Sequence, residues 1–185
     1  MRGINASKFL IIFAFYCVLD ISFAKRVITF NSVSCLSSNK SLVFFECFVK
    51  PITDDIATLN VVIHFLKTVP DISFAYDVTL KAANRGFRSL VNGKDIDMCK
   101  YLDGSKKSIA LNYGLNLVRK HFPEGSLHPC PYKAGTIELK NILSGSSETK
   151  MTVFPPAMYM IKLKYYNKED DNIASLNVTC TSKDI

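Results

Sequence analysis

The chain has 185 residues, of which 48% are hydrophobic and 21% are charged, and its formal net charge is +7. This apolar and aromatic content excludes an intrinsically disordered chain. The basic residues are scattered in pairs such as Lys106-Lys107 and Arg119-Lys120, with no long basic run. Such scattered charge indicates a solvated surface, and the alternative is an attraction to anionic lipid or glycan surfaces.

The first 24 residues have the pattern of a secretory signal peptide. Arg2 and Lys8 precede an apolar run, and Ser22-Phe23-Ala24 follows it as a small-x-small cleavage site. The apolar run is shorter than the roughly 20 residues that a membrane span needs. We therefore expect residues 1–24 to be removed and residues 25–185 to form one secreted domain, without a nucleic-acid partner. An uncleaved membrane anchor is the alternative.

The cysteines also point to an oxidising compartment. Cys17 would leave with the signal peptide, so the mature chain would keep Cys35, Cys47, Cys99, Cys130 and Cys180. Cysteines of secreted proteins usually form disulfides. Two bridges would leave one thiol over, and spacing alone does not decide the pairing. We favour Cys35–Cys47 and Cys99–Cys130; the rival pairs Cys35 or Cys47 with Cys180.

Two tripeptides match the acceptor pattern for N-linked glycosylation. They are Asn39-Lys40-Ser41 and Asn177-Val178-Thr179. In a secreted chain we expect both Asn39 and Asn177 to be glycosylated and to face solvent.

The first half of the chain consists of predicted strands, which span Val27–Val33, Leu42–Val49, Leu59–Val69, Ser73–Leu80 and Phe87–Val91. The first two flank a polar turn, which is typical of a β-hairpin. Asn92-Gly93 is typical of a tight turn, because both residues tolerate positive φ.

One segment, between Cys99 and Cys130, has a helical period. Four apolar residues recur there at spacings of four, three and four, namely Leu111, Leu115, Val118 and Phe122. This spacing places them in one stripe of a helix, which Pro123 and Gly125 end. We expect the stripe to pack on the core, as part of a helical insert that a disulfide closes.

Three more strands are predicted after the insert, over Thr136–Leu143, Ala157–Tyr166 and Ile173–Thr181. In the second, odd-numbered residues from Ala157 to Tyr165 share one face. In the third, Cys180 has the same inward parity as Leu176 and Val178. It is therefore a buried free thiol, a bridge to an early strand or a dimerising cysteine. Evenly spaced strands with one helical insert predict a mostly β chain, an antiparallel β-sandwich of the immunoglobulin-like type.

Catalytic and metal-binding motifs are missing from the sequence. It has no Gly-x-Ser-x-Gly elbow and no Gly-rich phosphate loop. Its histidines, His64, His121 and His128, have no partner at a metal-ligand spacing. We therefore expect neither an enzyme nor a metal or other cofactor.

A site for an apolar molecule needs a gap between layers that large side chains line with few polar groups. The candidate residues are Phe65, Phe74, Tyr76, Leu80, Phe87, Phe122, Tyr159, Ile161 and Leu163. Composition does not distinguish an open sandwich from a filled one. A cavity of about 300 Å³ or more would favour a ligand, and a much smaller void would favour a filled core.

Five short segments carry a resemblance to a known family. They are residues 30–35, 47–50, 97–102, 128–132 and 155–159. In this order they resemble the small secreted fly proteins with a domain of unknown function (number 1091). That family is similar in outline to the MD-2-related lipid-recognition and GM2-activator sandwiches and to chemosensory proteins thought to carry lipid-like cues. Its four-cysteine pattern leaves Cys180 as an extra, and Ala157 stands where a glycine is often expected.

The resemblance implies a secreted protein that holds a lipid or other small apolar molecule between two sheets, with the Cys99–Cys130 insert at the cavity mouth, and it suggests a chemosensory role. The alternative is a secreted interaction module with a filled core. Such a module would bind a receptor through the outer face of the Ala157–Tyr166 strand, formed by Met158, Met160, Lys162, Lys164 and Tyr166.

Overall fold

The structure is a computed structural model of the chain. It describes residues 26–37, 42–54, 56–82, 86–144, 155–168 and 173–184. The predicted signal peptide and the Asn39 sequon lie outside the described residues.

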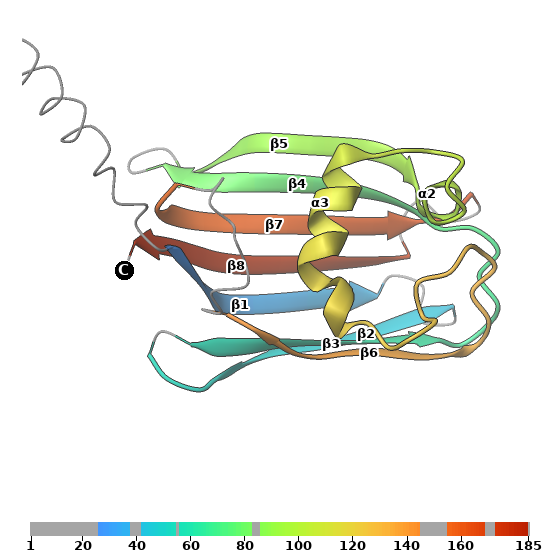
Figure 1. The fold of residues 1–185 in the computed structure, drawn as a ribbon, viewed down its shortest axis with the longest axis horizontal. Coiled ribbons are helices and arrows are strands. Elements are labelled where there is room, and N and C mark those ends of the chain that lie inside the picture. The colour runs from blue at the N-terminus through green and yellow to red at the C-terminus, as the bar shows by residue number, and fades with distance from the viewer. Residues whose placement is uncertain are drawn as a thin grey trace, which may run out of the picture.

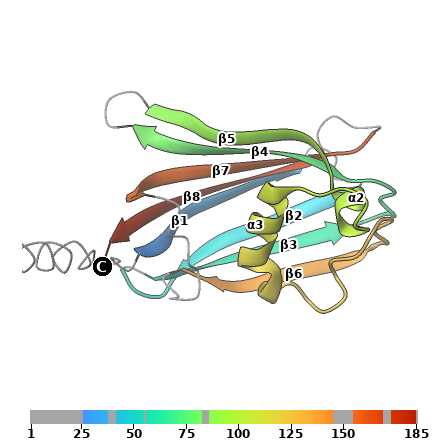
Figure 2. The ribbon, with the colours of Figure 1, turned by 45° about the horizontal axis from the view of Figure 1, so that its top comes forward.

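Two β-sheets pack face to face (Figures 1 and 2). The larger sheet has the strand order β1-β8-β7-β4-β5 and the smaller the order β2-β3-β6, with every pairing antiparallel. The strands are β1 (Arg26–Ser37), β2 (Val43–Pro51), β3 (Ala57–Phe65), β4 (Ser73–Ala82), β5 (Gly86–Asp97), β6 (Gly135–Leu143), β7 (Ala157–Tyr166) and β8 (Ala174–Asp184). The predicted antiparallel β-sandwich is confirmed.

The predicted hairpin of the first two strands is wrong. β1 pairs with β8, and β2 pairs with β3, so the chain changes sheets between the two strands. The Cys35–Cys47 disulfide joins them across the sheets, with a Cα–Cα distance of 6.0 Å. Two strands with alternating apolar residues around a polar turn can pair as a hairpin or lie in different sheets. In each case one face of each strand is buried. The sequence pattern therefore does not separate strands that pair from strands that face each other.

Side chains that alternate along the strands form the core. In β8, Leu176, Val178 and Cys180 are buried, as their parity predicted. Leu176 and Val178 pack in one cluster with Leu59 and Leu139 of the smaller sheet. The two sheets are thus held together by interdigitated aliphatic side chains, the usual cohesion of a sandwich.

The tight turn predicted at Asn92-Gly93 is also wrong, because β5 continues through both residues to Asp97. Gly93 pairs with Tyr76 of β4, and a Cβ atom at Gly93 would lie 2.5 Å from Tyr76 Cε1. The register of this pair shifts between Phe74 and Tyr76. Glycine is needed here for room beside the ring, not for a turn.

The third strand is shorter than predicted. It ends at Phe65 rather than at Val69. Val69 instead forms an isolated antiparallel bridge with Tyr132, which lies after the insert. The end of this apolar run therefore ties the insert to the sandwich.

The insert contains α2 (Met98–Leu102), α3 (Ile109–Val118) and the short 3-10 helix η1 (Arg119–His121). Figures 1 and 2 show α3 crossing from the β5 side of the larger sheet towards β6 of the smaller one. Leu111 and Leu115 are buried against Phe74, and Val118 and Phe122 pack on the same cluster, so the packing of the predicted apolar residues is confirmed. The helix is shorter than predicted, because α3 ends at Val118 and Phe122 has extended backbone after η1. Among the described residues, no helix is both long and apolar enough to cross a membrane.

Candidate functional site

The histidines take part in local contacts. His64 Nδ1 lies 3.1 Å from Thr136 Oγ1, and the His64 ring stacks on Phe44. His128 stacks on Tyr132, with ring centroids 4.4 Å apart. Within the described ranges, no group of three or more His, Cys, Asp or Glu side chains is placed to hold a metal ion. The space between the sheets holds the candidate site.

The first cavity has a volume of about 70 Å³. It lies between the inner face of the larger sheet, the end of β6 and the end of α3 with η1. Its walls are formed by Ile28, Phe30, Val78, Leu117, Val118, Lys120, His121, Ile142, Leu143, Ser144, Tyr159, Ile161 and Cys180. Lys120, His121, Tyr159 and Cys180 are the charged or titratable side chains of this wall, and the rest is mainly apolar.

The second cavity has a volume of about 90 Å³ and lies nearer the disulfide of the insert. Its walls are formed by Val43, Phe45, Ile63, Phe65, Ile72, Met98, Phe122, Ser126, Leu127, Tyr132, Ile137, Tyr165, Ile173 and Ala174. None of these side chains carries a charge.

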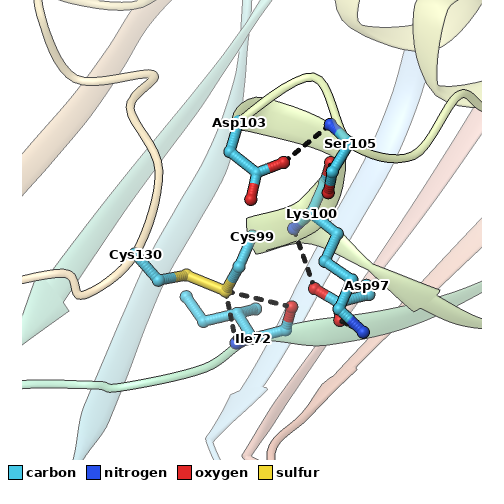
Figure 3. Close-up of polar contacts among 7 residues, drawn as sticks. All are labelled: Ile72, Asp97, Cys99, Lys100, Asp103, Ser105 and Cys130. Carbon is cyan, nitrogen blue, oxygen red and sulfur yellow. Dashed lines mark hydrogen bonds and ion pairs between the residues drawn. A yellow bond between two sulfur atoms is a disulfide. The ribbon is translucent and has the colours of Figure 1, made fainter.

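The insert supplies part of the second cavity wall, and the Cys99–Cys130 disulfide anchors it there. The backbone N–H of Ile72 donates to Cys99 Sγ at 3.3 Å, and Ile72 itself lines the cavity (Figure 3). Asp97 caps α2 by accepting a hydrogen bond from the backbone N–H of Lys100 at 3.0 Å. The start of the insert is thus fixed beside the cavity.

The nine candidate ligand residues are divided among several places. Tyr159 and Ile161 line the first cavity, and Phe65 and Phe122 line the second. The others line neither: Phe74 and Tyr76 pack beneath α3, Leu163 packs in the central cluster, and Leu80 and Phe87 belong to no described cluster. Phe87 is 38% exposed on the edge strand β5. The ligand set therefore stays a prediction.

Sequence reasoning missed most of the wall residues. Tyr165 shares the inward parity of Tyr159 and Ile161 on β7 and could have been found from that alternation. Ile28 and Phe30 of β1 were likewise visible as alternating apolar residues. Tyr132 and Leu127 had no periodic signal, because they lie in irregular backbone of the insert.

Burial raises the pKa of three ionisable groups in these walls, one of which is the Tyr132 phenol. It raises the pKa of the Cys180 thiol to about 11 and the pKa of the Tyr165 phenol to about 12. Cys180 is the free cysteine of the described part of the chain, since the other four form the two disulfides. All three groups are therefore neutral at physiological pH.

The chain matches no protein-family model and no curated protein sequence. Two solved structures are similar to it in outline. The crystal structure of chicken MD-1 complexed with lipid IVa covers 80% of this chain and 88% of its own, at 10% identity and a TM-score of 0.37. A Niemann-Pick type C2 protein from the Japanese carpenter ant covers 83% and 90%, at 16% identity and a TM-score of 0.32.

Proposed function

We propose that the protein is a secreted, non-enzymatic binding protein that holds a lipid-derived or other small apolar molecule between its two sheets. The observation that carries the proposal is the pair of cavities, whose walls are almost wholly apolar. Ligand pockets share this character, an apolar lining with a few placed polar groups. The five segments that resemble the secreted fly family support the same proposal, and so does the signal-peptide pattern.

The helical insert supports the proposal because its residues form part of both cavity walls. Val118 lines the first cavity and Phe122 the second, and both pack on the central aliphatic cluster. A displacement of this short segment would enlarge both cavities without breaking a strand pairing.

The cavity volumes limit the ligand. At about 70 and 90 Å³ both fall below the roughly 300 Å³ of common ligand pockets. A cavity of about 150 Å³ accommodates benzene. The present conformation therefore suits a molecule of few heavy atoms, and a long acyl chain requires the insert to move.

The small volumes also favour the second candidate function, an interaction module with a filled core that binds a receptor. The outer face of β7 offers Lys162 and Lys164, which are exposed, for such a contact. The two functions differ in one measurable property, the uptake of apolar molecules.

Native mass spectrometry and protein NMR titration with straight-chain alcohols and fatty acids, from butanol to hexadecanol and from butanoate to palmitate, test the proposal. Binding should shift the signals of cavity residues and slow the reaction of Cys180 with N-ethylmaleimide when the first cavity is filled. Bare protein throughout the panel would overturn the ligand proposal and leave the interaction module.

Cavity-filling variants locate the ligand. Ala174→Leu places a larger side chain in the second cavity and Val78→Phe in the first. The matched controls are Ala134→Leu, at an exposed position before β6, and Val62→Phe, which lies opposite Glu46 and Glu138 away from the core. Only the cavity variants should lose binding.

A further inference from the structure

The Tyr165 side chain has an unusual environment for a phenol. Its ring packs against Phe45 and Phe74, with centroids 5.4 and 6.4 Å apart. Tyr165 is partly buried and forms part of the wall of the second cavity. Among the described residues, no partner forms a hydrogen bond with its hydroxyl, and burial alone raises its pKa. A hydroxyl that is partly withdrawn from water and has no protein partner loses hydration without compensation.

The other hydroxyls of this cavity have partners. Ser126 Oγ donates to the Pro123 carbonyl at 2.7 Å, and Tyr132 interacts with the backbone of His128. On the same face of β7, the Tyr159 hydroxyl donates to the Pro155 carbonyl at 2.6 Å. Tyr165 thus stands apart from its neighbours in the second cavity and on its own strand.

The walls of this cavity also restrict the charge of a ligand. None of its side chains is charged, so nothing in the wall compensates a buried carboxylate or ammonium group. A neutral oxygen is different, because the Tyr165 hydroxyl can donate one hydrogen bond to it or accept one from it.

We propose that the second cavity binds a neutral, largely apolar molecule with one oxygen, such as a ketone, aldehyde, ester or alcohol, and that the Tyr165 hydroxyl holds this oxygen. This inference rests on the proposed function and refines it. The apolar body of the ligand lies against Ile63, Phe65 and Ile137, and its oxygen faces Tyr165.

The cavity of about 90 Å³ is smaller than the roughly 150 Å³ that accommodates benzene, so probes of six or seven heavy atoms enter only with a small outward movement of the insert. Pentan-2-one, pentan-1-ol, pentanoate and hexane have similar sizes and differ in oxygen chemistry and charge. NMR titration of the full mature protein measures the dissociation constant of each. Pentan-2-one and pentan-1-ol should bind more tightly than hexane by roughly 5- to 10-fold, the usual gain from one neutral hydrogen bond. Pentanoate should bind more weakly than both.

Tyr165→Phe removes the hydroxyl and keeps the ring. It should weaken pentan-2-one binding by roughly 5- to 10-fold, leave hexane binding unchanged and cause no loss of thermal stability. A merely structural role would produce the opposite result, a loss of stability with unchanged affinities. Tyr113→Phe is the matched control, since Tyr113 is exposed on α3 and lines neither cavity. It should leave pentan-2-one binding unchanged.

These measurements distinguish a failure of the role of Tyr165 from a failure of the proposed function. If hexane binds as tightly as pentan-2-one, or if Tyr165→Phe weakens neither, the role of Tyr165 is overturned while the proposed function stands. If the cavity takes up only a water molecule, Tyr165→Phe likewise weakens the binding of neither probe. If no probe binds and the longer alcohols and acids also fail, the proposed function falls with it.

Discussion

At the scale of single residues, the burial of Cys180 makes the stability of the fold depend on pH. The side chain is 5% exposed on β8 and lines the first cavity. Its pKa rises from 9.0 to about 11 because burial disfavours the thiolate. Of the three roles that its parity allowed, the structure shows the buried free thiol.

We expect the protein to lose stability in alkali through Cys180. Above pH 9 an unfolded chain releases the thiol proton, whereas the folded chain keeps it up to about pH 11. The native state then binds more protons than the unfolded state, so the unfolding free energy falls with rising pH between these values. The fall is about 2–3 kcal/mol for a shift of this size, and none is expected from this group below pH 9.

Urea unfolding at a series of pH values measures this fall. Cys180→Ala should be less stable at pH 8 because of lost packing, but its stability should depend less on pH between 9 and 11. The remaining slope comes in part from Tyr165, whose pKa is raised in the same direction. An unchanged slope in Cys180→Ala would contradict the assignment.

Two glycines provide a paired prediction. A Cβ at Gly93 would meet the Tyr76 ring at 2.5 Å, whereas a Cβ at Gly114, in the middle of α3, would meet nothing within 4 Å. Gly93→Ala should therefore destabilise the protein by about 1–3 kcal/mol, the usual cost of overpacking. Gly114→Ala should stabilise it by roughly 0.5–1 kcal/mol, because alanine has the higher helix propensity. Thermal unfolding measures both, and equal shifts would show that the Tyr76 ring moves aside at no cost.

At the scale of elements, the insert is anchored at its two ends and packs on the sandwich between them. α2 begins at the Asp97 cap beside Cys99, and Tyr132 bridges to Val69 just after Cys130. Between these anchors, α3 contacts the sandwich through its buried Leu111 and Leu115. The Cys99–Cys130 bond closes a separation of 31 residues, so it restricts the unfolded chain strongly.

Removal of this bond should destabilise the protein and loosen one region. The chain-entropy model assigns about 3–4 kcal/mol to a loop of this length. We expect Cys99→Ser with Cys130→Ser to show this loss in urea unfolding, and hydrogen exchange should increase mainly over residues 98–132. Because the insert forms part of the second cavity, binding there should weaken as well.

The double variant Cys35→Ser with Cys47→Ser is the control. It also removes one disulfide, but that bond joins β1 to β2 and lies outside the insert. Its exchange should increase near these strands and not over α3. Equal protection of the insert in both variants would show that packing alone holds it.

At the scale of the whole molecule, the two sheets and the helical insert enclose the cavities together. Wall residues of the second cavity come from the smaller sheet, from the larger sheet and from the insert. A ligand that binds only this assembled state should therefore stabilise the whole fold by linkage.

Thermal unfolding with pentan-2-one tests this coupling. At ten times its dissociation constant, the ligand should add about 1.4 kcal/mol to the unfolding free energy, which raises the Tm by roughly 3–6 °C. Ala174→Leu should abolish the increase, and Ala134→Leu should retain it. The same increase in both variants would place the ligand outside the second cavity.

The sequence by itself determined much of the local structure. Alternation set the inward faces of β7 and β8, and the four-three-four spacing set the stripe of α3, because each period follows from local backbone geometry. The antiparallel sandwich followed from the number and spacing of these strands. The preferred disulfide pairs agree with the structure, although the spacing of the cysteines left rivals open.

Only the tertiary structure decided which strands pair and which face each other across the core. β1 and β2 lie in different sheets, and β5 continues through Asn92-Gly93, since both outcomes depend on contacts with distant residues. The cavities and the isolated hydroxyl of Tyr165 depend on how closely the two sheets and the insert approach one another. A void is the volume that side chains from several elements leave unfilled, and no single segment of sequence encodes that volume.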